Sequence, residues 1–318
     1  MNKLPFSSQS CCPVCHACDC SFWTRGRDRL LRITDDEFIY LRCGACGACF
    51  QAAPPAPAEI SKFYPSDYGP YQKWKQTATP GFFRKATGKL LNSGTRKLRH
   101  RLKALYQPPR GYSVFLDYGC GSEKFLGTAK HKGWRTIGVD FSESVVEKVK
   151  AAGHGGLIAG EKLWREIPDE SLTLVRMNHV IEHLYDPADV LQHLFRKLKP
   201  GGRLHLATPN PAGLGSRLFG SRWLGLDCPR HIILFSPQLV ADCLKKAGFQ
   251  SVEIFPEFVT KDVARSAGFL LADMGWMKHE KIPSLVDAPL GVAVLALPCF
   301  IAAKINLCDR YHVIAQKC

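Results

Sequence analysis

The sequence predicts an α/β protein built around a doubly wound, mainly parallel β-sheet. From residue 111 onward, apolar runs of strand length alternate with segments of helical periodicity. The first run, V-F-L-D at 114–117, leads into two glycines one residue apart and then into a helical segment. Alternating strands and helices bury a parallel sheet between two helical layers, and such sheets bind ligands beyond the carboxyl ends of their strands.

Local signals mark the boundaries of these elements. Gly133 stops the first helical segment, and Ser142 is a good N-cap for the second. Ser236 is a further N-cap and is followed by a proline at the first helical position, while K-P-G-G ends the helix before it. We therefore expect strands at 114–117, 135–140, 172–178 and 203–208, near 251–255 and at 311–316, and helices at 121–132, 142–150, 188–198 and 236–247.

The glycine turn after the first strand indicates a nucleotide ligand. Gly119 and Gly121 allow a tight turn and a close approach of the backbone to a ligand. A dinucleotide fingerprint needs a third small residue, but Lys124 occupies that position and weakens this reading. Asp140 ends the next strand about 20 residues later, where a carboxylate accepts the hydroxyls of a ribose. The pattern therefore favours an adenosine-containing ligand.

The first part of the chain is rich in cysteine. Eight of the 14 cysteines lie before residue 50, and we expect thiols that bind metal rather than disulfides. C-P-V-C at 12–15 and C-G-A-C at 43–46 have the form of two knuckles that hold Zn²⁺ tetrahedrally. Spacing alone leaves the register open, since Cys18 and Cys49 complete a second possible set.

Composition shifts divide the chain into three parts. Residues 1–52 form the cysteine-rich head, and residues 53–110 a Pro- and Tyr-rich connector followed by a basic amphipathic helix. Residues 111–318 form the α/β domain, with lid insertions expected at 209–235 and 257–309. The net charge of +15 indicates an anionic partner, and residues 82–110 carry nine Lys or Arg and no acid.

The α/β region resembles class I S-adenosyl-L-methionine (SAM)-dependent methyltransferases. The motifs are D-Y-G-C-G-S, G-V-D, M-N-H-V-I-E-H-L-Y-D-P, L-K-P-G-G-R-L-H-L-A-T-P-N and A-G-F, and they are most similar to the branch that includes ubiquinone-biosynthesis O-methyltransferases. The resemblance implies a Rossmann-like sheet of seven strands. It also implies that SAM is bound by Asp117, Gly119, Cys120, Gly121, Asp140, Phe141, Asn178 and His179.

The resemblance extends to the head and to a second polar cluster. Members of this branch often carry a C-P-x-C…C-x-x-C-G head, which implies a zinc ribbon with structural Zn²⁺ held by Cys12, Cys15, Cys43 and Cys46. W-L-G-L-D-C-P-R-H at 223–231 also recurs in the branch. A neutral imidazole takes a proton from a hydroxyl near pH 7, so His231 is a candidate general base. His179 is the second candidate catalytic residue, at the methyl-transfer centre.

H-V-I-E-H at 179–183 has other readings. It matches an inverted zinc-protease pattern, which its position at a strand end argues against. Related quinone O-methyltransferases bind a divalent metal with E-x-x-E-H, but His179 replaces the first Glu here. We therefore expect Glu182 and His183 to be packing residues, with a metal as the less favoured alternative.

The methyl acceptor is open at this point. We expect a small-molecule, saccharide or lipid-linked acceptor, methylated at oxygen. The alternative is a zinc-headed methyltransferase for ribosomal or transfer RNA, with the basic helix as the RNA grip. Residues 82–106 and 288–303 are also suited to peripheral contact with an anionic membrane. We recognise neither a signal peptide nor a transmembrane segment in the sequence, and therefore expect a cytoplasmic protein. If it binds lipid, we expect it at the inner face of the membrane.

Overall fold

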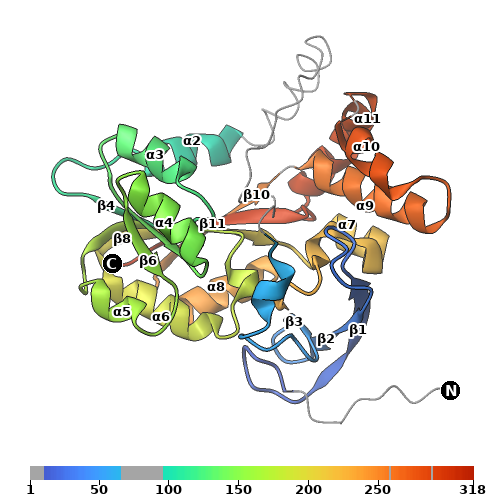
Figure 1. Cartoon of the computed structure of the whole chain (residues 1–318), viewed down its shortest axis with the longest axis horizontal. Coiled ribbons are helices and arrows are strands. Elements are labelled where there is room, and N and C mark those ends of the chain that lie inside the picture. The colour runs from blue at the N-terminus through green and yellow to red at the C-terminus, as the bar shows by residue number, and fades with distance from the viewer. Residues whose placement is uncertain (1–10, 66–95, 258, 288) are drawn as a thin grey trace.

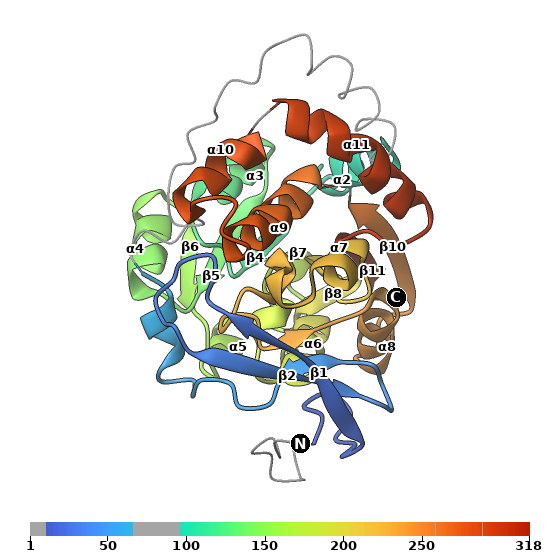
Figure 2. The ribbon, with the colours of Figure 1, turned by 90° about the vertical axis from the view of Figure 1, so that its right-hand side faces the viewer.

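The computed structural model describes residues 11–65, 96–257, 259–287 and 289–318. In Figure 1 the large sheet and its helices lie on the left, and the small head formed by the first strands lies at the lower right. The C-terminal helices lie above the head. A 90° turn keeps the head strands at the bottom and these helices at the top (Figure 2).

The large sheet confirms the predicted Rossmann-like fold class. Its seven strands run in the order β10-β11-β8-β7-β4-β5-β6. The five strands from β8 to β6 pair in parallel, and β11 is antiparallel to both β8 and β10. The connections leave β4 in opposite directions, which makes the carboxyl end of β4 the switch point where such sheets bind ligands. The strands are β4 (Val114–Tyr118), β5 (Arg135–Asp140), β6 (Gly155–Ile158), β7 (Leu172–Asn178), β8 (Leu198–Pro209), β10 (Ser251–Glu257) and β11 (Arg310–Gln316).

Helices cover both faces of this sheet. In β4, Phe115 packs into the cluster formed with α2, α3 and α4, whereas Leu116 packs into the cluster on the other face, with α5, α6 and α8. Burying one such side chain contributes about 1.5–3 kcal/mol, so the two clusters hold the sheet in place. The helices are α2 (Arg96–Leu105), α3 (Lys124–His131), α4 (Glu143–Ala151), α5 (Leu163–Glu166), α6 (Pro187–Lys197) and α8 (Pro237–Lys246).

The head shares its small sheet with the α/β domain. Strands β1 (Cys20–Arg27), β2 (Glu37–Cys43) and β3 (Cys49–Gln51) are antiparallel, and β9 (Ile233–Leu234) completes the order β1-β2-β3-β9. Cys49 pairs with Leu234 and Phe50 with Ile233. Because β9 belongs to the segment after β8, backbone hydrogen bonds join the head to the loop that carries His231.

Helices and 3-10 turns form much of the two expected lid segments. The first contains α7 (Leu214–Phe219) and the short 3-10 turns η4 (Gly220–Arg222) and η5 (Leu224–Leu226), and the second contains α9 (Thr260–Asp273), α10 (Ile282–Asp287) and α11 (Pro289–Lys304). Asp273 ties them to the head, because it pairs with Arg29 at 2.7 Å and with Arg222 at 2.8 Å.

Three local features differ from the expected pattern. Strand β6 was not predicted, because its first two residues are glycines, which disfavour strands. A Cβ on Gly156 would lie 2.8 Å from Lys150 Cγ and 3.0 Å from the Val146 carbonyl oxygen, so close packing against α4 requires the glycine. K-P-G-G lies inside β8, which begins at Leu198 and not at residue 203 as expected. Ser142 occupies the N-cap position without a side-chain capping bond.

Candidate active site

A cavity of about 1310 Å³ lies at the carboxyl ends of β4, β5 and β7. The head contributes Leu30 and Leu31 to its wall, and α9 contributes Asp262 and Arg265. Eight of the nine site residues predicted in the α/β domain line this cavity: Gly119, Cys120, Gly121, Asp140, Phe141, Asn178, His179 and His231. The ninth, Asp117, does not line it.

The glycine turn is fixed to the end of β5. Gly119 and Gly121 have φ of +71° and +61°, a region that favours glycine. A Cβ on Gly119 would also lie 2.5 Å from a methyl carbon of Val180. The amides of Gly119 and Cys120 both donate to the Val139 carbonyl, at 2.8 and 3.0 Å. The turn is therefore set before any ligand binds.

Asp140 presents its carboxylate to the cavity at the end of β5. One oxygen accepts the Gly121 amide at 2.9 Å and the other the Ser142 amide at 3.0 Å. Burial raises the pKa of Asp140, and the two amides oppose that shift. Each carboxylate oxygen has a further lone pair, so both oxygens can accept ribose hydroxyls. Phe141 beside it is 45% exposed and meets Tyr64 edge-on at 5.0 Å.

Asp117 lies beneath the cavity and is completely buried. Both of its oxygens accept from the same Arg176 nitrogen, at 3.0 and 2.9 Å. Burial raises the pKa of Asp117 to about 6, although Arg176 works against the shift. The Arg176 guanidinium lies 4.0 Å from the Phe125 ring centre and faces the cavity in place of Asp117. The sequence reasoning missed Arg176, whose only signal was one arginine within the apolar strand L-T-L-V-R-M-N.

Three histidines surround the buried Glu182 carboxylate. His231 Nδ1 lies 2.8 Å from the Gly225 carbonyl and His183 Nδ1 2.9 Å from the Arg230 carbonyl. A carbonyl only accepts, so both Nδ1 atoms carry a proton, and in a neutral ring with this tautomer the lone pair lies on Nε2. His179 Nδ1 lies 3.1 Å from Glu182, and its Nε2 accepts from Arg310 at 3.3 Å.

Burial and the neighbouring charges shift the pKa values of Glu182 and His183 in this cluster. Burial tends to raise the pKa of Glu182, but the His179 hydrogen bond and the neighbouring histidines lower it to about 2, so Glu182 is ionised. Burial lowers the pKa of His183 to about 4, and His231 adds to the shift, so His183 is neutral. Glu182, His183 and His231 place one ligand atom each within 4.8 Å of one another, which is also a possible divalent-cation arrangement.

The head holds the backbone on which His231 lies. Tyr40 and Gln51 donate to the His231 carbonyl oxygen, at 2.7 and 2.8 Å. Arg230 is completely buried and pairs with Asp28 of the head at 2.7 Å and with Asp227 at 2.6 Å. Sequence reasoning identified His231 but none of these partners, which are distant in sequence except for Asp227.

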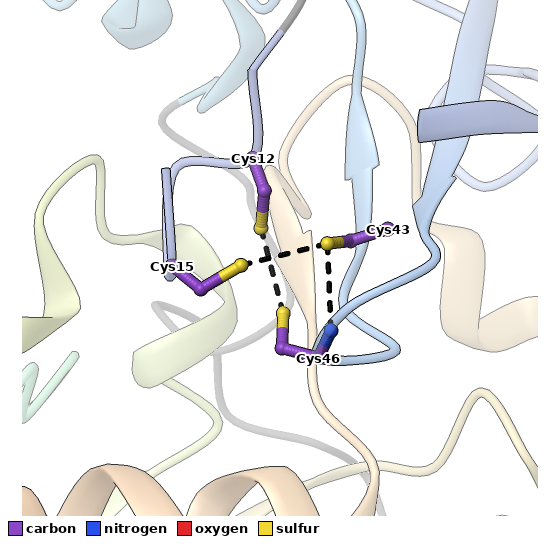
Figure 3. Close-up of side chains that lie close together, drawn as sticks. All are labelled: Cys12, Cys15, Cys43 and Cys46. Atoms are coloured by element: carbon purple, nitrogen blue, oxygen red, sulfur yellow. Dashed lines mark hydrogen bonds between the residues drawn. The ribbon is translucent and has the colours of Figure 1, made fainter. Parts of the chain in front are cut away.

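The four cysteines chosen for the metal site come together in the head (Figure 3). Cys12 Sγ lies 3.6 Å from Cys46 Sγ, and Cys15 Sγ lies 3.5 Å from Cys43 Sγ. Tetrahedral Zn²⁺ with Zn–S bonds of about 2.3 Å separates its sulfurs by about 3.8 Å, so the thiols fit the ion. Cys11 and Cys18 are joined by a disulfide, contrary to the expectation of free thiols.

The structure describes only part of residues 82–106 but most of residues 288–303, the two segments expected to contact a membrane. Residues 82–95 of the first lie outside the described residues, and the rest forms α2, whose Leu98 and Leu105 are buried against the sheet. In α11, Leu297 and Ile301 are 57% and 50% exposed, and Ile305 just after it is 59% exposed. Within the described part of the chain, every helix is too short or too polar to span a bilayer.

Comparisons with known proteins identify a methyltransferase family. A family model described as "Methyltransferase domain" matches residues 91–254. A probable S-adenosylmethionine-dependent methyltransferase of Mycolicibacterium smegmatis is 35% identical over 101 residues, 30% of this chain and 37% of that protein. The ubiquinone biosynthesis O-methyltransferase of Pseudomonas fluorescens is 28% identical over 124 residues, 36% of this chain and 53% of that protein.

The chain thus spans less than two thirds of the length of these curated relatives. A solved SAM-dependent methyltransferase from Archaeoglobus fulgidus is 22% identical, with a TM-score of 0.46, and the match covers 74% of this chain and all of that one. The family match covers just over half of the chain and includes the glycine turn, Asp140 and His231. The chain therefore belongs to the methyltransferase-domain family.

Proposed function

We propose that the protein methylates a hydroxyl of a small-molecule, saccharide or lipid-linked acceptor, with His231 as the general base. The observation that carries this proposal is the tautomer of His231. Its Nδ1 proton is held by the Gly225 carbonyl, so its Nε2 lone pair is available in the cavity to accept a proton.

Residues at the switch point would hold SAM. Asp140 accepts the ribose hydroxyls, the Gly119–Gly121 turn brings the backbone close to the ligand, and Arg176 offers a cation to the carboxylate of the methionine end. SAM supplies a methyl group on a positively charged sulfur, which is displaced in line. Positioning and exclusion of water by the head and α9 therefore account for most of the acceleration.

Glu182 gives His231 its capacity to act as a base. The acceptor hydroxyl gives its proton to Nε2, which leaves a cationic imidazole ring. The ionised Glu182 carboxylate lies 3.9 Å from that nitrogen and stabilises the cation. Thr208 donates to the other Glu182 oxygen at 2.9 Å and keeps the carboxylate in place. His179 orients Glu182 instead of acting as the base, because Arg310 occupies its Nε2 lone pair.

Structural Zn²⁺ in the head is part of the proposal. The four converging thiols support it, and four thiolates leave no open position for catalysis. The metal would fix the first knuckle to the turn between β2 and β3, and β3 pairs with β9. Zinc would thereby keep the His231 loop in place.

The test is methyl transfer from labelled SAM to cell extract fractionated into RNA, lipids and small molecules. We expect label in the lipid or small-molecule fraction and a loss of about 10²–10⁴-fold in the His231→Ala variant. His183→Ala is the matched control, because it removes a neighbouring imidazole without removing the base. Equal losses in both variants would instead favour a divalent cation at Glu182, and label in RNA would favour the RNA-methyltransferase alternative.

Membrane contact is a further part of the proposal. The exposed Leu297, Ile301 and Ile305 and the net charge of +15 support binding to an anionic lipid surface. Flotation with vesicles of anionic and of neutral lipid tests it, with Ile301→Asp as the variant. Recovery in the soluble fraction under both conditions would contradict the contact.

A further inference from the structure

We propose that the acceptor is an anionic amphiphile, whose negatively charged group is bound by Arg265 and whose apolar part lies against the head. This inference rests on the proposed function, because it takes the same cavity as the site of methyl transfer. It goes further by naming the chemical class of the acceptor and the residue that selects it.

Arg265 is an unpaired cation in the wall of the cavity. It lies in α9, is half-buried, and has no ion pair or hydrogen bond from its side chain among the residues that the structure describes. By contrast, Arg176 pairs with Asp117, and Arg310 pairs with Asp262 on the helix that carries Arg265. Removing a charge from water is costly unless a partner compensates it. A ligand with a negative charge would supply that partner.

Hydrogen bonds connect the position of Arg265 to that of His231. The next residue on α9, Ser266, accepts the Leu224 amide at 3.0 Å through its hydroxyl oxygen. The residue after Leu224, Gly225, holds His231 Nδ1 at 2.8 Å. Arg265, Leu224 and His231 all line the cavity, so an acceptor that reaches Arg265 can present another atom to the base.

The neighbouring wall is apolar and is fixed by the head. Leu30 and Leu31, in the loop between β1 and β2, line the cavity together with Ile60 and Leu224. The Asp28 carboxylate accepts a hydrogen bond from the Leu31 amide at 3.1 Å, which helps to fix the conformation of this loop. This surface favours a hydrocarbon portion of the acceptor, because removing apolar area from water is favourable.

The size of the cavity leaves room for such an acceptor. Ligand cavities in proteins commonly measure roughly 300–1,000 Å³. The volume here, about 1310 Å³, exceeds that range and extends from Asp140 to Arg265. SAM at the switch point would therefore leave the part next to the head and α9 for a second molecule of substantial size.

The experiment compares three probes that share a ten-carbon chain: decyl phosphate, decanoate and decanol. Binding is measured by calorimetry below the micelle-forming concentration, with S-adenosylhomocysteine present at saturation. We expect decyl phosphate or decanoate to bind at least about tenfold more tightly than decanol, since a charged hydrogen bond contributes about 1.5–3 kcal/mol. The two anionic arms distinguish a phosphate ester from a carboxylate.

Arg265→Gln should remove this preference, weakening the anionic probes by about 10- to 100-fold and leaving decanol within about twofold. Arg265→Lys should restore part of it. Arg217→Gln, on the exposed surface of α7, is the matched control and should change nothing. Circular dichroism and melting of each variant establish that the fold is intact.

Two results would overturn the inference. One is equal binding of the three probes to the wild-type protein, and the other is an unchanged preference in Arg265→Gln. Failure of the proposed function looks different, because the labelled methyl group would then appear in RNA, or His231→Ala would lose no more activity than His183→Ala. Binding of S-adenosylhomocysteine together with an unaltered probe preference contradicts the anionic-acceptor inference alone.

Discussion

Replacing Asp28 with alanine should destabilise the protein and impair methyl transfer more than cofactor binding. Asp28 is a head residue, yet its carboxylate pairs with Arg230, which directly precedes the proposed base. It also accepts the amides of Leu31 and Ile33, at 3.1 and 2.9 Å. A single substitution therefore releases both the His231 loop and the apolar wall of the cavity.

The size of the effect follows from burial. Asp28 and Arg230 side chains are both 0% exposed, and breaking such a pair from one side costs about 3–5 kcal/mol. Asp227 still partners Arg230, which favours the lower part of that range. The unfolding entropy of about 2.1 cal/mol/K per residue, over 318 residues, converts the cost to a fall in Tm of about 4–7 °C.

The assay is thermal melting of Asp28→Ala, followed by calorimetry with S-adenosylhomocysteine and the labelled transfer assay. Glu37→Ala is the matched control, because it removes a head carboxylate that pairs with Arg25 at the surface, where the two side chains are 35% and 52% exposed. Exposed pairs contribute about 0–1 kcal/mol, so its Tm should fall by less than about 2 °C. A Tm for Asp28→Ala within 1 °C (an estimate from the same entropy scale) of the control would refute the reasoning.

Three further predictions concern the cofactor, the metal and pH. Asp140→Ala should weaken binding of S-adenosylhomocysteine by about tenfold or more in calorimetry, since two ribose hydroxyls lose a charged acceptor; an unchanged Kd would contradict the ribose assignment. Metal analysis of the reduced protein should find about one zinc per chain, with less in Cys43→Ser, and absence of zinc would contradict the assignment. The pKa of Glu182 is lowered from 4.5 to about 2, so its stabilising contribution is complete above pH 4.5 and is lost as pH falls through 2. Glu182→Gln should therefore make Tm less dependent on pH in that window, and parallel melting curves for the two proteins would speak against it.

Much of the fold and part of the site could be predicted because their signals are local. Gly119, Gly121 and Asp140 lie at strand ends that a short stretch of sequence identifies, and the structure brings them to one cavity. The two cysteine knuckles are also local patterns, and their thiols converge as the chosen register required. In each case, neighbouring residues along the chain carry the information.

The site residues that the sequence did not reveal act through contacts between residues that are far apart in the chain and meet only in the tertiary structure. Arg176 reaches Asp117 because β7 lies beside β4 in the sheet, although 59 residues separate them. Arg230 and Asp28 are 202 residues apart. Arg265 carried no sequence signal, because arginine is common on helices and only the tertiary structure shows that this one lines the cavity. Strand β6 was hidden by glycines that helix packing, rather than strand propensity, requires.

Strand β9 limits how this protein can be divided into separate parts. Two residues of the His231 loop, Ile233 and Leu234, complete the sheet of the head, so the boundary between the head and the α/β domain runs through a set of paired strands. A truncated protein that begins after the head would present an unpaired β9 and an Arg230 without Asp28. Exchange of heads between related proteins should therefore succeed only when residues 223–235 are exchanged with them. The head and the His231 loop thus form one structural module.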